Sequence, residues 1–294
     1  MHVMATNGSP RNEKSSTCHI LSPLLEGMRA AGATTELVHL GRLKIRSCLG
    51  CFLCWVKTPG KCVQRDDMAA VLERFVQADL LVFGTPLYHY NVSGLMKNFI
   101  DRTLPSFEPW LVEDPVHPGK SGHPDRYPKD RSMLLVSPCG FPEFDHFEPL
   151  VHYFQFFARK LGWGYLGEIL RPAGESLSEE QHQETFAWYY NLVRQAGQEI
   201  VRQGRITSEV QAGLRKDLFP GGPGIQERSK PLLERNNGQV WSDPQAAGAS
   251  LMIYSGLRCH KRFRIKPASP PPFPPPALQN RLPLGGEGRV RGRS

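Results

Sequence analysis

Hydrophobic positions follow two alternating patterns over residues 1–205. Short continuous apolar runs, such as those within residues 78–86 and 133–140, are typical of central strands that are buried on both faces. Longer segments, such as residues 16–31, repeat their apolar positions about every 3.6 residues, which indicates a helix with one buried face. Because the two kinds of segment alternate, the pattern predicts a doubly wound α/β domain with a parallel sheet between two layers of helices.

The expected elements of this domain are five strands and five helices. The strands are residues 2–6, 35–40, 78–86, 133–140 and 165–170. The helices are residues 16–31, a segment after Asp66, a segment after Ser93, residues 146–161, and a segment from Ser178 to near Gln203. Asp66 and Ser93 are suitable N-caps, and Gly162 is a suitable C-cap. Ser178 with Gln181 has the pattern of a capping box for the last helix.

Residues 206–294 have a different composition. Segments such as "ASPPPFPPPAL" and "LGGEGRVRGRS" cannot bury enough apolar surface to offset the entropy of ordering them. We therefore expect an irregular, basic and largely disordered tail. The chain has a formal net charge of +8, and residues 258–294, with nine Lys or Arg and one Glu, account for all of it. Because the predicted domain is neutral, we expect no nucleic-acid partner.

The first residues, "MHVMATNGSPR", lack the apolar stretch of a secretory signal, and no run has the roughly 20 apolar residues of a membrane span. We therefore expect a cytoplasmic protein without a membrane partner. In a reducing compartment, clustered cysteines bind metal or carry out redox chemistry more often than they form structural disulfides. This expectation makes the cysteine pattern described below a candidate functional feature.

The loop after the first strand, "GSPRNEKSST", runs directly into a helix. A helix N-terminus presents free N–H groups and the positive end of a dipole, which together favour an anion. Hydroxyl groups from Ser9, Ser15, Ser16 and Thr17 would add donors around a phosphate, and Arg11 could bind it with two hydrogen bonds. The loop therefore predicts a site for a monophosphate, with an ordinary N-capped turn as the alternative.

The loops after the third and fourth strands, "TPLYHYNVSG" and "SPCGFPE", suit a flat aromatic ring. Pro86 and Gly140 would let the backbone approach such a ring closely, and Tyr88 or Phe141 could stack on it. In open α/β sheets, ligands bind at the carboxyl ends of strands where the strand order reverses. We therefore expect this loop pair and the phosphate loop to share one ligand. An aromatic loop that merely covers the core is the alternative.

Four motifs in this order, "GSPR…ST", "CxxCxxCW.KTPGKC…DDM", "GTPLYHYNVSGLMKNFIDR" and "CGFPE", resemble the flavodoxin-like NAD(P)H-dependent FMN reductases, and especially their iron-sulfur flavoprotein branch. The resemblance implies a five-stranded parallel sheet of order 2-1-3-4-5, bound FMN, and assembly as a homodimer or homotetramer. It also implies that the phosphate contacts are Ser9, Arg11, Ser15, Ser16 and Thr17. The residues implied to line the flavin ring are Pro86, Leu87, Tyr88, Asn91, Cys139, Gly140 and Phe141.

Cys48, Cys51, Cys54 and Cys62 form a CxxCxxCx7C pattern. Three thiols at two-residue gaps can converge on one face of a cubane cluster, and the fourth can return after the turn at residues 59–60. This spacing indicates a [4Fe-4S] site. Zinc is an alternative metal for these four cysteines, although structural zinc sites more often have two separate CxxC pairs. A third interpretation is a loop that packs beside the flavin or at a subunit contact and binds no metal.

The predicted activity is that of an FMN-dependent oxidoreductase. Hydride would pass from NAD(P)H to the flavin, or electrons would come from a reduced protein, and a quinone, a flavin or a protein would accept them. No catalytic side chain is expected, because the flavin carries the chemistry. A flavodoxin-type electron carrier and a non-catalytic nucleotide-binding or zinc-binding regulator are the alternatives.

Two pairs of charged residues are predicted to be structural. Asp66 and Asp67 precede an expected helix, where capping and the helix dipole favour carboxylates. Asp101 and Arg102 end the next helix, and we expect them to form an ion pair with each other.

Overall fold

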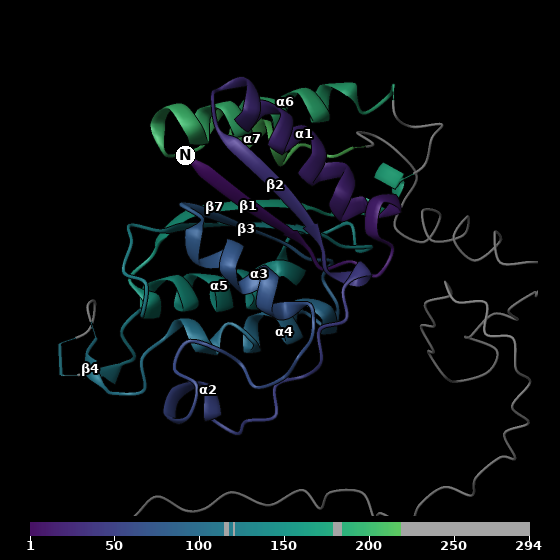
Figure 1. Cartoon of the computed structure of the whole chain (residues 1–294). Coiled ribbons are helices and arrows are strands. Elements are labelled where there is room, and N and C mark those ends of the chain that lie inside the picture. Colours follow the sequence, from purple (N-terminus) through teal and green to yellow (C-terminus); the bar gives the residue numbers. More distant parts are fainter. Residues whose placement is uncertain (115–117, 120, 179–183, 219–294) are drawn as a thin grey trace, which may run out of the picture. The chain divides into compact units, whose positions relative to one another are not determined.

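The computed structural model describes residues 1–114, 118–119, 121–178 and 184–218. The strands of the main sheet are β1 (His2–Asn7), β2 (Thr34–His39), β3 (Leu80–Gly84), β6 (Ser132–Pro138) and β7 (Gly164–Arg171). They form one parallel sheet in the order β2-β1-β3-β6-β7, so the predicted order 2-1-3-4-5 is confirmed (Figure 1). Two further strands, β4 (Val112–Glu113) and β5 (Ser121–Gly122), pair antiparallel outside this sheet.

The strand order reverses at β1, which pairs with β2 on one side and with β3 on the other. The carboxyl ends of the central strands are in register there, because Asn7 is opposite both His39 and Gly84, and Gly84 is opposite Val136. The loops that follow β1, β3 and β6 therefore leave the sheet at the same edge. Ligand sites of open α/β sheets lie at such an edge.

Helices cover both faces of the sheet, as the hydrophobic pattern predicted. Their bounds are α1 (Ser16–Ala30), α2 (Leu53–Val56), α3 (Met68–Gln77), α4 (Gly94–Asp101), α5 (Glu148–Leu161), α6 (Ala187–Gln203) and α7 (Ser208–Leu214). One buried cluster joins the sheet to α1, α6 and α7, and a second cluster joins it to α3, α4 and α5 (Figure 1). Within the part of the chain that the structure describes, no helix is both long and apolar enough to cross a bilayer.

Helices α1 and α6 approach each other closely because each has a glycine at the contact. A Cβ atom at Gly27 would overlap the carbonyl oxygen of Arg194, and one at Gly197 would overlap the carbonyl oxygen of Leu24. The two backbones therefore touch without intervening side chains. This contact fixes the position of α1, the helix whose N-terminus follows the predicted phosphate loop.

The last two helices differ from the prediction. Helix α6 begins at Ala187 with Phe186 as its N-cap, whereas Ser178 ends a separate 3-10 turn, Gly174–Ser178, so the proposed start at Ser178 is wrong. Gln181 lies outside the described residues. Helix α7 lies beyond residue 205, the predicted end of the domain, and it packs into the core through buried Val210 and Leu214. Residues 219–294, the rest of the predicted tail, lie outside the described part.

Candidate functional site

The three predicted loops meet at one edge of the sheet. Gly8 N–H donates to the carbonyl oxygen of Gly84 at 2.7 Å, which joins the loop after β1 to the end of β3. The Ser93 hydroxyl donates to the carbonyl oxygen of Gly8 at 2.6 Å. Leu87 N–H donates to the carbonyl oxygen of Pro138 at 3.0 Å, which joins the loop after β3 to the end of β6. Backbone bonds therefore hold the loops in a continuous row.

Asn7, the last residue of β1, shapes the phosphate loop. Its side-chain amide is buried and donates to the carbonyl oxygen of Asn12 at 2.9 Å, while its oxygen accepts the N–H of Ser9 at 2.9 Å. The same amide nitrogen lies 3.2 Å from the Ser15 hydroxyl oxygen. Sequence reasoning missed Asn7, although its position at the end of a strand before a loop was a usable signal.

The start of α1 presents buried hydroxyl groups, as predicted. Ser9, Ser15, Ser16 and Thr17 are all buried. Ser15 is the N-cap and accepts the N–H of Cys18 at 3.1 Å, so its hydroxyl already has a structural role. The Thr17 hydroxyl has no hydrogen-bond partner among the described residues. A buried hydroxyl without a partner costs free energy, and an oxygen of a bound anion would satisfy it.

Arg11 lies beside these hydroxyl groups and is exposed. One guanidinium nitrogen is 3.5 Å from the Ser16 hydroxyl oxygen. Arg11 also acts on Tyr88 in the loop after β3: burial raises the pKa of Tyr88, the positive charge of Arg11 opposes this, and Glu175 adds to it. The predicted phosphate residue Arg11 and the predicted ring residue Tyr88 are therefore close enough to interact.

Residues 88–91 form a tight hairpin. Tyr88 N–H donates to the carbonyl oxygen of Asn91, and Asn91 N–H donates to that of Tyr88, both at 3.0 Å. The two residues at its tip, His89 and Tyr90, have positive φ angles of 47° and 60°. Side chains other than glycine are rare in this region. The hairpin thus presents Tyr88, His89 and Tyr90 to solvent as exposed residues at the edge of the sheet.

Aromatic rings join the loops after β3 and β6. The ring of Tyr90 is nearly parallel to that of Phe141, with an interplanar angle of 9° and centroids 6.4 Å apart. The ring of His146 stacks on Phe141 at 4.1 Å. Gly140 is exposed beside them, whereas Pro86 and Leu87 are buried below the hairpin. The predicted ring-lining residues thus belong to one continuous group of loops.

Cys139 lies in this group as a buried, protonated thiol. Burial raises its pKa to about 12. Its sulfur donates to the carbonyl oxygen of Phe141 at 3.3 Å, and its N–H donates to the carbonyl oxygen of Arg171 at 3.0 Å. Because a neutral thiol is a poor nucleophile and metal ligand, Cys139 acts here as a support for the loop.

The second predicted site, the four-cysteine segment, lies on the loop that joins β2 to α3 and contains α2. We call residues 47–65 the cysteine loop. Cys54 is buried, Cys62 is half-buried, and Cys48 and Cys51 are exposed. Burial raises the pKa of Cys54, and the nearby thiols of Cys62, Cys48 and Cys51 raise it further.

The thiols are not arranged as a finished metal site. Across the described ranges, no three His, Cys, Asp or Glu side chains are placed to hold a metal ion. Four thiols on one loop are the right donors for a [4Fe-4S] cluster, but their present arrangement does not fit one. A cluster would require the cysteine loop to close further.

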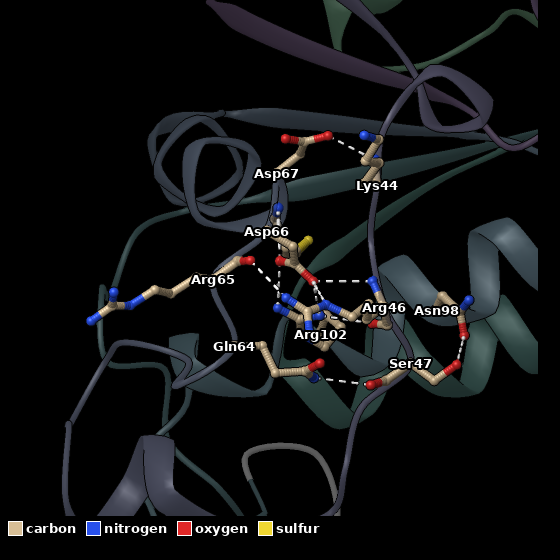
Figure 2. Close-up of polar contacts among 10 residues, drawn as sticks. Lys44, Arg46, Ser47, Gln64, Arg65, Asp66, Asp67, Asn98 and Arg102 are labelled. Atoms are coloured by element: carbon tan, nitrogen blue, oxygen red, sulfur yellow. Dashed lines mark hydrogen bonds and ion pairs between the residues drawn. The ribbon is translucent and has the colours of Figure 1, made fainter.

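The charged residues Asp66, Asp101 and Arg102 have other partners than predicted. Asp101 pairs with Lys97 at 2.7 Å, one turn earlier on α4, and not with its neighbour Arg102, because adjacent residues of a helix point in different directions. Arg102 instead binds Asp66, with two contacts of 2.7 and 2.8 Å (Figure 2). The predicted N-cap at Asp66 is wrong by one position, because the N-cap of α3 is Asp67; Asp66 nevertheless accepts the N–H of Met68, the first residue of the helix, at 3.2 Å.

Comparison with known proteins gives the same fold for this arrangement. An FMN-dependent NADH-azoreductase from Bacillus anthracis, whose crystal structure contains FMN, superposes with a TM-score of 0.51 at 17% identity. The match covers 68% of this chain and 99% of the azoreductase. At this identity the similarity shows the fold alone, and it confirms the flavodoxin-like architecture.

Sequence comparison identifies more similar relatives for about a third of the chain. An iron-sulfur flavoprotein from Archaeoglobus fulgidus is 41% identical over 103 residues, which are 35% of this chain and 49% of the relative. One from Methanocaldococcus jannaschii is 33% identical over 105 residues, covering 36% and 53% respectively. The chain thus spans about half the length of these relatives. Residues 1–116 match the profile of NADPH-dependent FMN reductases, and this part of the chain is therefore similar to that family, as parts of the chain are to the iron-sulfur flavoproteins.

Proposed function

We propose that this chain binds FMN at the carboxyl edge of its sheet and transfers electrons from NAD(P)H, or from a reduced protein, to an acceptor. The observation that supports this most directly is the row of three bonded loops around a buried Thr17 hydroxyl that has no partner among the described residues. The family match supports the choice of FMN, because residues 1–116 contain two of the three loops.

The FMN phosphate would bind at the N-terminus of α1. Thr17 and Ser16 would donate their hydroxyl hydrogens, and Arg11, which is exposed above them, would supply the positive charge. Ser15 would contribute by capping the helix, since its hydroxyl is already engaged with Cys18. Ser9 would contribute through the turn that Asn7 organises, because its N–H is held by the Asn7 side chain.

The flavin ring would lie between the loops after β3 and β6. Pro86, Leu87 and the 88–91 hairpin would form one side, and residues 139–141 would form the other. Bound FMN supplies the hydride-accepting chemistry, so the protein has to orient the ring and exclude water from it. The protonated Cys139 would hold residue Phe141 in place without reacting.

The proposal extends to the electron acceptor and to the role of the four thiols. A quinone, a second flavin or a protein would accept the electrons. The thiol spacing and the names of the relatives support a [4Fe-4S] cluster on Cys48, Cys51, Cys54 and Cys62. Because these thiols would have to move to hold a cluster, no step of the proposed reaction is assigned to them.

Anaerobic purification of the full chain tests the proposal. We expect about one FMN per chain, and oxidation of NADH or NADPH that speeds up when a quinone is added. Absence of FMN, with no binding when FMN is titrated, would contradict the proposal. Bound FMN without NAD(P)H oxidation would favour the electron carrier. Iron and sulfide analysis decides the cluster separately, and light scattering decides between a homodimer and a homotetramer.

A further inference from the structure

The cysteine loop is held at its base by contacts between residues 44–47, where it begins, and residues 64–67, where it ends (Figure 2). Asp67 accepts the N–H of Lys44 at 2.7 Å. Further along, Gln64 donates from its side chain to the carbonyl oxygen of Ser47 at 2.9 Å, and Arg46 donates to that of Arg65 at 2.8 Å. All three contacts are exposed to solvent, where such bonds are individually weak.

One contact at this base is different because it is buried and comes from another element. The side chains of Arg102 and Asp66 are 1% and 3% exposed, and their contact is bidentate, with 2.7 and 2.8 Å between nitrogen and oxygen atoms. Arg102 also donates to the carbonyl oxygen of Arg46 at 2.7 Å. A single guanidinium group thus binds both ends of the cysteine loop (Figure 2).

Cys62, the last thiol of the loop, is half-buried and lies four positions before Asp66 in the chain, so the Arg102–Asp66 pair restrains the segment that carries this thiol. A buried, bidentate arginine fixes the direction as well as the distance of its partners. The contact with Asp66 therefore restrains the end of the loop that carries Cys62.

Helix α4 connects this base to the predicted flavin edge. Arg102 follows the last residue of α4, and Ser93 precedes the first. At its other end, Ser93 donates to the carbonyl oxygen of Gly8 and accepts the N–H of Met96. Asn98, in the middle of α4, bonds to the Ser47 hydroxyl at 3.2 Å. One short helix thus contacts both the phosphate loop and the cysteine loop.

We propose that Arg102 is a positioning residue that closes the base of the cysteine loop on Asp66 and on the Arg46 carbonyl, and holds Cys62 in place before any metal is bound. Through α4, the same residue sets where the loop lies relative to the carboxyl edge of the sheet. The proposal does not require the chain to bind FMN, so it can fail or succeed independently of the proposed function.

Labelling of single thiols tests this role in the full chain. The reduced protein is treated with a chelator, mixed with a maleimide, and the labelling rate at each cysteine is measured by peptide mass spectrometry. In Arg102→Met we expect labelling of half-buried Cys62 to accelerate by about tenfold or more, because removal of one member of a buried pair opens the contact. Loss of the positive charge alone would slow this thiol, so acceleration reports movement of the loop.

Cys18 serves as an internal control because it is buried in α1, on the other face of the sheet. Lys97→Ala is the matched control variant, since it removes an exposed ion pair from the same helix and should leave every labelling rate unchanged. If Cys62 is labelled at the wild-type rate in Arg102→Met while Cys18 stays protected, the proposal is wrong.

Asp66→Asn provides a second test in case Arg102→Met unfolds. This variant keeps the volume of the side chain and weakens the same contact, so we expect faster labelling of Cys62 with Cys18 still protected. An unchanged rate at Cys62 would overturn the proposal. Loss of Cys18 protection in both variants would show that the pair supports the whole domain, which also overturns a local positioning role.

Discussion

The loops at the carboxyl edge of the sheet and the cysteine loop are held in different ways. At the edge, backbone groups of neighbouring loops and strands bond to one another, as Gly8 does to Gly84 and Leu87 to Pro138. The cysteine loop instead leaves Leu49, Phe52 and Val56 exposed, and one buried ion pair at its base ties it to α4. The edge is therefore formed by the fold itself, whereas the cysteine loop depends on side-chain contacts, at its base and at Trp55, whose ring nitrogen donates to the carbonyl oxygen of Leu104 at 3.3 Å.

This difference indicates which site can adapt. The loops after β1, β3 and β6 are bonded to central strands and cannot move without loss of sheet contacts, so together they suit a ligand of fixed shape. A loop that is held by side-chain contacts at a few positions can change its arrangement between them while its ends stay in place. The exposed thiols of Cys48 and Cys51 can thus rearrange on a loop whose base is already set.

The largest expected effect comes from the α1–α6 contact, which positions the helix behind the phosphate loop. In Gly27→Ala the new methyl group would overlap the carbonyl oxygen of Arg194, so α1 and α6 would have to separate. We expect a loss of about 3 kcal/mol in the free energy of unfolding, measured by urea denaturation. Gly94→Ala is the control, because nothing lies within 4 Å of a Cβ atom at that position. Equal stability of the two variants would contradict this account of the α1–α6 contact.

A smaller effect is expected on the affinity of the carboxyl edge for FMN. Arg11→Ala should weaken FMN binding by about 10-fold to 100-fold, since a charge-assisted hydrogen bond contributes about 1.5–3 kcal/mol. Titration of flavin fluorescence measures this affinity. Lys14→Ala, which removes an exposed charge from the same loop, should bind FMN nearly as well as wild type. If both variants lose the same affinity, Arg11 has no specific contact with the phosphate.

A third effect is expected when the pH is lowered, because protonation of Asp66 should loosen the cysteine loop alone. Burial raises the pKa of Asp66, but hydrogen bonds from Arg102 and from the backbone N–H of Arg46 outweigh this and lower it overall. The ion pair therefore stabilises the loop above the unfolded-state pKa of about 3.9, and this contribution is lost as the pH falls through the lower folded-state value.

Labelling of Cys62 with a disulfide reagent that reacts in acid follows this transition. We expect the labelling rate to rise at low pH in the wild-type protein, and to be high and less pH-dependent in Asp66→Asn. The edge loops should not follow the same titration, and Cys18 reports them because it lies in α1. A simultaneous rise at Cys18 and Cys62 would show that acid unfolds the whole domain.

The smallest effect concerns the interior of the cysteine loop. Gly50 has a φ angle of 61° and nothing lies within 4 Å of a Cβ atom there, so Gly50→Ala would meet no clash but would strain the backbone. We expect a cost of about 1 kcal/mol, confined to the loop. Thermal unfolding of the domain should change little. A loss as large as that of Gly27→Ala would mean that the loop is packed as tightly as the sheet.

The main sheet could be predicted because its central strands are continuous apolar runs and its helices have regular apolar faces. The N-cap at Ser93 and the C-cap at Gly162 were also predictable, since both depend on residues next to them in the sequence. The start of α6 was not, because Leu177 packs into the core from a separate turn while Ser178 and Gln181 imitate a capping box. Local patterns cannot distinguish these two cases.

Contacts between distant segments were beyond prediction. Arg102 and Asp66 are 36 positions apart, and only the packing of α3 beside α4 brings them together. The hydrogen bonds of Asn7 to residues 9–15 also depend on the path of the loop, which returns to the buried end of β1. In the same way, the spacing of the four cysteines specifies the donors, but the path of the loop decides whether those donors meet.

The hairpin at residues 88–91 has a consequence for protein engineering. Glycine would adopt the backbone angles of His89 and Tyr90 more easily, so the native side chains leave the protein less stable than glycine would, by about 1 kcal/mol at each position. A search for thermostable variants would therefore select glycine here. Such variants would lack the imidazole of His89 and the phenol of Tyr90 that lies parallel to Phe141, and a screen for heat resistance alone would not reveal this loss.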